Sequence, residues 1–126
     1  MSPFTSPARY LSLGTWRRNG QLVATPVWFA PSGNALYAFS AGNAGKVKRL
    51  RNASRACVAL CDWRGTLLDE WHPAHAFLVS DVQERAAAFR AIRRKYGWQM
   101  RVVDLGARVA GTMESRAVIR IEAAAP

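Results

Sequence analysis

The chain has 126 residues, of which 50% are hydrophobic, and a formal net charge of +10 from 18 Lys and Arg against 8 Asp and Glu. This length suits one domain over residues 1–126 with one core, and the hydrophobic content excludes a disordered chain. The positive charge favours anionic partners, such as cofactor phosphates, nucleic acid or a membrane surface.

The sequence carries no signal for secretion or for membrane insertion. Its first residues lack a charged segment followed by an apolar one, and no apolar run approaches the roughly 20 residues that a membrane helix needs. Cys57 and Cys61 lie in a segment that reads as a buried strand. Their spacing would separate them by about 13 Å along a strand, whereas a disulfide needs Cα atoms within about 7 Å. We therefore expect a cytoplasmic protein with buried free thiols and no membrane partner.

Strands and turns alternate in the first part of the chain. The pattern predicts strands over residues 9–17, 21–30 and 36–40. Asn19-Gly20, between the first two, is the strongest short hairpin signal, and residues 31–34 form a second turn. Strands at this spacing favour a meander rather than alternating β-α units.

Pro26 interrupts the second predicted strand. Proline cannot donate to a sheet ladder, so it marks either a sheet edge or a local break. At a break, neighbouring backbone groups can face a ligand instead of a partner strand. The residue alone leaves both interpretations open.

Residues 42–55 form a basic segment without a carboxylate, directly after the third predicted strand. A Gly-containing turn leads there into a short predicted helix, whose free amides and dipole favour an anion. Lys46 and Arg49 are three residues apart and share a helix face. This pair predicts a phosphate site and hence a phosphorylated ligand. The five cations of the segment are Lys46, Lys48, Arg49, Arg51 and Arg55.

The second part of the chain predicts one long helix between strands. Strands are expected over residues 56–63, 67–79 and 116–122. The helix starts near Ser80, where Ser80 with Gln83 or Asp81 with Glu84 gives a capping-box pattern, and Gly97 is a natural C-cap. The predicted fold is therefore mainly β: an antiparallel barrel of six strands, with a short helix after strand three and a longer helix before the last strand.

Residues for autonomous catalysis are missing. No serine lies in a Gly-x-Ser-x-Gly elbow, and His72 and His75 lack a third well-spaced metal ligand. Asp69 and Glu70 would face opposite sides of a strand, so they form no acid/base pair. An enzyme without such groups depends on a bound cofactor for its chemistry. Aromatic platforms for a flat ring are available in Trp16, Trp28, Trp63, Trp71 and Trp98.

Four motifs occur in an order that matches one known family: Thr25-Pro-Val-Trp28, the segment from Ser40 through Gly45 to Asn52, Cys61-Asp-Trp-Arg-Gly65 and Lys95-Tyr-Gly-Trp98. Together they resemble the pyridoxamine 5′-phosphate oxidase-like split β-barrel flavoproteins. The nearest branch is the one that uses the deazaflavin coenzyme F420 in place of flavin mononucleotide (FMN). The chain departs from that pattern in its N-terminal helix, shortened to residues 1–8, and in Asp69-Glu70, where the family often has Gly.

The resemblance implies a homodimer with the cofactor at the subunit interface. Lys46 and Arg49 would hold the phosphate with Ser40 nearby, residues 25–28 would lie against the ring, and Trp98 would lie near the second subunit. The implied cofactor-binding residues are Thr25, Pro26, Val27, Trp28, Ser40, Gly45, Lys46, Arg49, Arg51 and Trp98.

Three functions follow from these observations. The first is hydride transfer from a reduced deazaflavin to a small organic substrate, with Lys48, Arg51 and Arg55 extending a basic strip for a long acidic tail. The second is an FMN-dependent oxidoreductase or flavin carrier on the same fold. The third is a non-enzymatic β-barrel that binds single-stranded nucleic acid through charge and exposed aromatic rings.

Overall fold

The protein is built around one antiparallel sheet whose two edge strands follow each other in the chain. The computed structural model describes residues 3–5 and 8–124. The strands, after a short 3-10 helix at Pro3–Thr5, are β1 (Leu11–Trp16), β2 (Leu22–Val27), β3 (Phe29–Ser32), β4 (Ala35–Ser40), β5 (Arg55–Leu60), β6 (His72–Val79) and β7 (Ala117–Ala123). The helices are α1 (Gly45–Leu50), α2 (Val82–Tyr96) and α3 (Trp98–Ala110). No helix among the described residues is long and apolar enough to cross a membrane.

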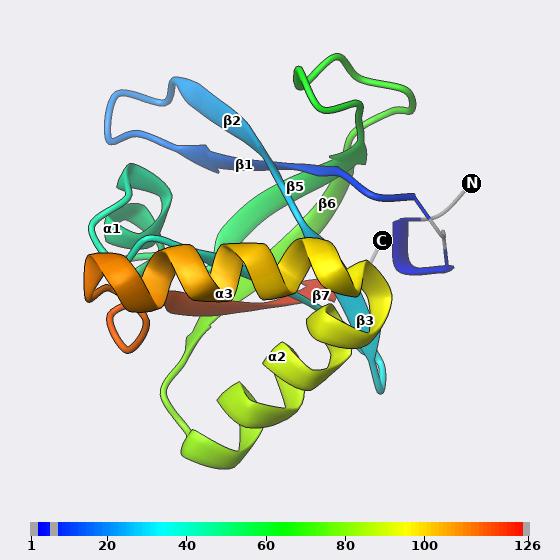
Figure 1. The fold of residues 1–126 in the computed structure, drawn as a ribbon. Coiled ribbons are helices and arrows are strands. Elements are labelled where there is room, and N and C mark those ends of the chain that lie inside the picture. Colours follow the sequence, from blue (N-terminus) through cyan, green and yellow to red (C-terminus); the bar gives the residue numbers. More distant parts are fainter. Residues whose placement is uncertain (1–2, 6–7, 125–126) are drawn as a thin grey trace.

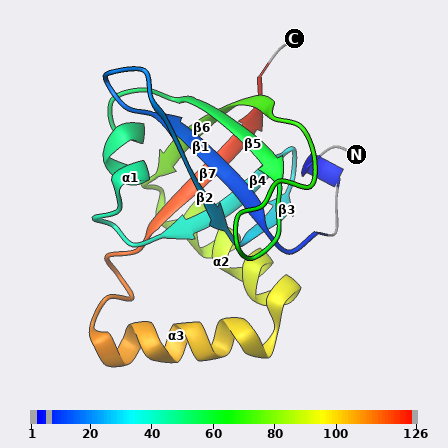
Figure 2. The same ribbon diagram turned by 90° about the horizontal axis from the view of Figure 1, so that it is seen from above.

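The sheet has seven strands in the order β2-β1-β5-β6-β7-β4-β3, and it curls into a half-barrel (Figure 1, Figure 2). The prediction of six strands is therefore wrong, because residues 21–30 form two strands instead of one. β2 pairs with β1 and β3 pairs with β4, so the chain changes partner at Trp28. The interpretation of Pro26 as an edge residue is confirmed, since β2 lies at one edge of the sheet.

Both hairpins expected in the first part of the chain are confirmed. The first joins β1 to β2, with Trp16 opposite Leu22. Gly20 there has φ of 87°, a left-handed conformation that glycine adopts without steric cost. The second joins β3 to β4, with Ser32 opposite Ala35. Its turn is shorter than the predicted residues 31–34, because Pro31 and Ser32 belong to β3.

The segment between β5 and β6 differs from the prediction. The strand expected over 56–63 is β5, which ends at Leu60, and the strand expected over 67–79 begins only at His72. Residues 62–71 form a loop, tied to the end of β5 by a bridge between Cys61 and Leu67. Asp69 and Glu70 lie in this loop, so the alternation of a strand does not separate their carboxylates.

The helix starts and stops follow local chemistry. Asp81 caps α2 by accepting a hydrogen bond from the Glu84 amide, so the second of the two predicted pairs supplies the N-cap. The Glu84 carboxylate accepts from Tyr37 and Arg120, so the hydrogen bonds described for it do not include the return bond of a full capping box. Gly97 ends α2 as predicted, but α3 follows immediately and was not predicted. Gly111 ends α3 in the left-handed conformation at φ of 73°.

Two groups of buried side chains form the core. The first group contains Leu11, Phe29 and Ile119, with further residues from the other strands and from α1. Because both ends of the strand order contribute to this group, the sheet encloses its own core. The second group packs α2 against the outer face of the sheet and includes Phe89, Ile92 and Met100.

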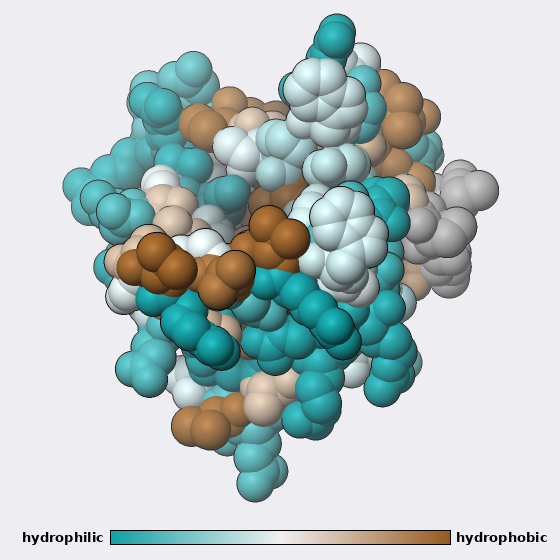
Figure 3. All heavy atoms as spheres, viewed as in Figure 1, coloured by the Kyte–Doolittle hydropathy of each residue, from teal (hydrophilic) through white to brown (hydrophobic). Residues whose placement is uncertain are grey.

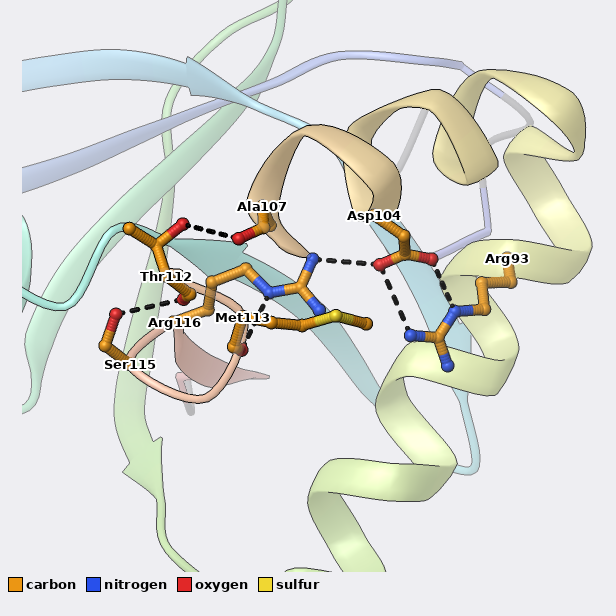
Figure 4. A network of polar contacts seen from close by, with 7 residues as sticks. All are labelled: Arg93, Asp104, Ala107, Thr112, Met113, Ser115 and Arg116. Carbon is orange, nitrogen blue, oxygen red and sulfur yellow. Dashed lines mark hydrogen bonds and ion pairs between the residues drawn. The ribbon is translucent and has the colours of Figure 1, made fainter. Parts of the chain in front are cut away.

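One ionic network fastens α3 to the rest of the molecule (Figure 4). Asp104 of α3 accepts hydrogen bonds from Arg93 of α2 at 2.8 Å and from Arg116, just before β7, at 3.0 Å. The Arg116 side chain is only 8% exposed. Otherwise α3 packs chiefly on α2 and lies outside the curled sheet (Figure 2).

Both cysteines are buried free thiols, as predicted. Burial raises the pKa of both thiols, that of Cys61 to about 11. A thiol reagent at pH 8 is therefore expected to leave both unmodified in the native protein, because the thiolate is the reacting form. The same reagent in denaturant should modify both, and rapid reaction of the native protein would contradict this placement.

Candidate functional site

An aromatic hollow of about 360 Å³, here called the ring hollow, opens between β2, the loop after β5 and α3. Its wall is mainly aromatic and apolar, and its one charged group is the Lys46 ammonium. This combination suits a flat ring that carries an anionic group, since ligand hollows join apolar walls with a few polar groups that fix orientation. The lining residues are Tyr10, Pro26, Val27, Trp28, Phe39, Lys46, Trp63 and Val103.

Trp28 is fixed in this hollow by Tyr96, which lies behind it. The two rings stack with centroids 4.4 Å apart and planes 8° from parallel. The Tyr96 hydroxyl accepts a hydrogen bond from the Phe29 amide at 3.0 Å and donates to the Arg9 carbonyl at 2.6 Å. The end of α2 thus holds the point at which the chain passes from β2 to β3.

Lys46 supplies a positive charge that no carboxylate offsets. Burial lowers the pKa of Lys46, and the neighbouring Arg49 guanidinium adds to this effect. The ion pairs among the described residues include none with Lys46, and α1 has no acidic residue in its first turn. An anion beside the ring hollow would therefore meet an unpaired, partly desolvated ammonium group.

Arg49 points into a different hollow from Lys46. Its Nε donates to Thr15 Oγ1 at 2.6 Å, and its guanidinium lies so close to Gly45 that a Cβ there would be 2.9 Å from it. Gly45, predicted as a cofactor residue, therefore gives Arg49 room. Lys46 and Arg49, which were predicted as a pair, therefore lie on one helix but line different hollows.

Beside Arg49 lies a second hollow of about 410 Å³, here called the basic hollow, between the tip of the β1–β2 hairpin and α1. Five of its lining residues are cations and none is a carboxylate. Its lining residues are Thr15, Trp16, Arg17, Arg18, Lys48, Arg49, Leu50, Asn52, Ala53 and Arg55.

The remaining predicted site residues lie apart from the ring hollow. Ser40 and Arg51 line a third hollow, formed with residues 112–116. Trp98 is 72% exposed on α3. Thr25 lies in edge strand β2, opposite Leu13, and its Oγ1 is buried without a hydrogen-bond partner. A buried hydroxyl without a partner is costly.

The predicted cofactor-binding residues omit four residues of the ring hollow: Tyr10, Phe39, Trp63 and Val103. Trp63 was nevertheless among the aromatic platforms predicted for a flat ring, and it belongs to a motif of the family resemblance. Tyr10 precedes β1 and could have been placed opposite residues 26–28 from the hairpin register. Val103 was missed because α3 was not predicted, although the apolar residues of α3 have helical spacing.

Asp69, Glu70 and His72 offer ligand atoms within 4.8 Å of one another. His72 Nε2 lies 3.2 Å from Asp69 Oδ2. The prediction that the two carboxylates face opposite ways is wrong, because they lie in a loop. This exposed acidic group has no further feature that indicates a metal ion.

Comparison with known proteins gives one family match. The sequence model described as "Pyridoxamine 5′-phosphate oxidase" matches residues 1–125. No curated protein sequence matches the chain significantly.

Solved structures share the fold at low sequence identity. A conserved hypothetical protein from Mycobacterium tuberculosis is 21% identical with a TM-score of 0.70, covering 99% of this chain and 82% of that one. The heme storage protein HutZ from Vibrio cholerae is 11% identical with a TM-score of 0.68, covering 94% and 83%. A FAD-binding protein from Mesorhizobium loti is 20% identical with a TM-score of 0.63, covering 93% and 82%. These similarities show the fold alone.

Proposed function

We propose, from the premise that this chain belongs to the pyridoxamine 5′-phosphate oxidase family, that it transfers a hydride from a reduced deazaflavin to a small organic substrate. The observation that carries the proposal is the ring hollow, whose aromatic walls surround a single unpaired ammonium group. FMN in the same hollow is the alternative, and a FAD-binding protein of the same fold supports it.

The residues present fit such a coenzyme. Pro26, Val27 and Trp28 would hold the ring from one side and Trp63 from another, while the Lys46 ammonium would hold an anionic group of the tail. When bound, the reduced coenzyme supplies the hydride.

The protein's own contribution is placement and exclusion of water. The Tyr96 stack fixes Trp28, which orients whatever lies against it. The apolar wall would limit water at the reacting atoms once a second subunit covers the hollow. The proposal assigns no side chain as an essential acid, and the substrate would take its proton from solvent or from the coenzyme.

The basic hollow favours the deazaflavin over FMN. Lys48 and Arg49 continue the positive charge past Lys46, toward the tip of the β1–β2 hairpin. A long acidic tail would use these cations, whereas the single phosphate of FMN needs only the first of them.

Lys46→Ala tests the assignment. Removing a charge-assisted contact of roughly 1.5–3 kcal/mol should weaken coenzyme binding by about tenfold to a hundredfold. Titrations with FMN and with the deazaflavin, followed by fluorescence, measure this. Lys48→Ala is the matched control on the same helix: it should leave FMN affinity unchanged and weaken only the long-tailed coenzyme. If Lys46→Ala binds both coenzymes as tightly as the parent protein does, Lys46 does not hold an anionic group of the coenzyme.

A homodimer that closes the ring hollow is part of the proposal. Four exposed apolar residues follow a 4-3-4 spacing along α3, here called the α3 stripe: Trp98, Val102, Leu105 and Val109. In Figure 3 apolar atoms run along α3 and appear again over the loop after β5, on the face that holds the ring hollow. Exposed apolar patches of this kind mark interaction sites.

Leu105→Glu tests the dimer. A charge in the α3 stripe should convert a dimer into monomers in sedimentation velocity and weaken coenzyme binding at the same time. Ala86→Glu, at an exposed position of α2, adds the same charge outside the stripe and should change neither. A parent protein that sediments as a monomer would remove the dimer from the proposal.

A further inference from the structure

One side chain behind the ring hollow joins two of its walls without lining the hollow itself. The Lys95 ammonium group, at the end of α2, donates to the Ala8 carbonyl and to the Phe29 carbonyl, each at 2.7 Å. Tyr10 and Trp28 line the ring hollow, and they lie just after Ala8 and just before Phe29 in the chain. Lys95 therefore ties together the two backbone segments that present these two rings.

The remaining contacts of Lys95 are with aromatic rings and not with carboxylates. Its Nζ lies 3.6 Å from the centroid of the Phe29 ring and 5.3 Å from that of the Tyr96 ring. The ion pairs among the described residues include none with Lys95. Burying an ammonium group without a counter-ion is costly. An apolar side chain would fill the same space without that cost, so the two hydrogen bonds are what lysine adds at this position.

The groups around Lys95 favour loss of its proton. Burial lowers the pKa of Lys95 to about 8, and the Arg9 guanidinium, from the segment before β1, adds to this effect. Arg9 itself donates to Gln99 of α3 and lies over the Tyr96 ring. Burial, with a smaller effect of Tyr10, raises the pKa of Tyr96 to about 12, so its hydroxyl stays neutral. From β3 only the Phe29 ring and carbonyl contact Lys95.

The lowered pKa gives this arrangement a signature in solution. A lysine in the unfolded chain has a pKa of about 10.4. Below pH 8 both states are protonated, and the folded state bears the full cost of the buried charge. Between these two values the unfolded chain binds more protons than the folded one, so the free energy of unfolding rises with pH. A Lys95 side chain in water would keep its ordinary pKa and give no such rise. The neutral amine keeps two N–H groups, so both hydrogen bonds can persist.

We propose that Lys95 is a positioning residue of the ring hollow, which sets the relative position of the Tyr10 and Trp28 rings by holding residues 8–10 and 28–29 on one ammonium group. Small errors of placement at a binding site are costly, and a side chain that touches no ligand can cause or prevent them. The role rests on the proposed function, because a coenzyme is what the two rings would hold. The hydrogen bonds themselves do not depend on it.

Lys95→Met tests this role, because Met keeps the length of the side chain and removes the donors. Affinity at pH 7 for FMN and for the deazaflavin, measured by fluorescence titration, should fall at least about fivefold, since two carbonyls lose a hydrogen bond. The matched control is Arg94→Met, which removes an exposed cation from the preceding position. It should leave both affinities within about twofold of the parent values.

Two measurements without coenzyme test the arrangement itself. In urea denaturation the free energy of unfolding of the parent protein, relative to Lys95→Met, should rise as the pH increases above 8. The chain has three lysines, Lys46, Lys48 and Lys95, so NMR of isotope-labelled lysine gives three side-chain signals, which single variants assign. In the parent protein the Lys95 signal should titrate with a pKa of about 8, and this measurement does not depend on the folding of any Lys95 variant.

The outcomes separate this role from the proposed function. If the parent protein binds a coenzyme and Lys95→Met binds it equally well, the positioning role is wrong and the proposed function stands. Equal weakening in Lys95→Met and Arg94→Met indicates net charge alone and also overturns the role. A Lys95 signal that titrates with the ordinary pKa of lysine shows that the two hydrogen bonds do not form in solution. If the parent protein binds neither coenzyme, both the proposed function and the role that rests on it are overturned.

Discussion

Asp104→Ala is expected to lower the free energy of unfolding by about 3 kcal/mol, because it leaves the buried Arg116 guanidinium without its counter-ion. Arg116 is 8% exposed and Asp104 is 14% exposed, so water cannot replace the lost carboxylate. The loss should appear first as detachment of α3, which this network joins to α2 and to the start of β7 (Figure 4). Urea denaturation and amide hydrogen exchange in residues 98–110 measure the two effects.

The Asp104 effect should also depend on pH. Burial acts to raise the pKa of Asp104, but hydrogen bonds from Arg93 and Arg116 outweigh it and the pKa is lowered. A carboxyl group with a lowered pKa contributes stability above its unfolded value of about 3.9. This contribution is lost as the pH falls through the lower folded value. The difference between parent and variant should therefore shrink at the acid end of the titration.

Two further variants separate the network from general damage. Glu114→Ala removes an exposed carboxylate close in sequence and should change stability by less than about 0.5 kcal/mol. Asp104→Leu/Arg116→Met removes both charges and should be more stable than Asp104→Ala. If the double variant is as unstable as Asp104→Ala, the cost lies in packing and not in an unpaired charge.

Tyr96→Ala is expected to have the other large effect, a loss of about 3–5 kcal/mol. Tyr96 is 3% exposed, and its removal leaves a cavity behind Trp28 and takes the hydroxyl from the Phe29 amide. Since Trp28 lines the ring hollow, the variant should also bind coenzyme more weakly. Chemical denaturation and coenzyme titration at a temperature where the variant is folded measure these two losses.

Tyr96→Phe separates stability from function at this position. It keeps the ring that stacks on Trp28 and loses only the hydroxyl, so it should cost about 1–3 kcal/mol from the unpaired Phe29 amide and Arg9 carbonyl. Coenzyme affinity should stay near that of the parent. Equal loss of affinity in Tyr96→Phe and Tyr96→Ala would show that stacking on Trp28 is not what shapes the hollow.

The sequence predicted those turns and helix ends that are determined by residues at the turn or helix end itself. Asn19-Gly20, Asp81 and Gly97 each set a turn or a helix end by hydrogen bonding or by φ, and these signals are visible in one sequence. The family resemblance added the site segment around residues 25–28, and three of those residues do line the ring hollow.

Two of the misses come from long-range packing. Residues 21–30 have a continuous strand pattern, and only the change of partner from β1 to β4 divides them at Trp28. Lys46 and Arg49 share a helix face, yet Arg49 turns toward Thr15 of β1, a neighbour that is distant in sequence.

Helix α3 is different, because its signal is local. Trp98, Val102, Leu105 and Val109 follow a 4-3-4 spacing that indicates an amphipathic helix. This part of the fold could have been predicted from the sequence.

The position of β7 bears on how the chain acquires its structure during synthesis. β7 is made after the other six strands, yet it lies between β6 and β4 inside the sheet (Figure 2). Until it emerges, the nascent chain can assemble only β2-β1-β5-β6 and, separately, β4-β3, each with an open edge that invites aggregation. The core therefore closes only after residues 117–123 have been made. Slowing translation upstream of Ala117 would prolong exposure of those edges and bring no earlier folding.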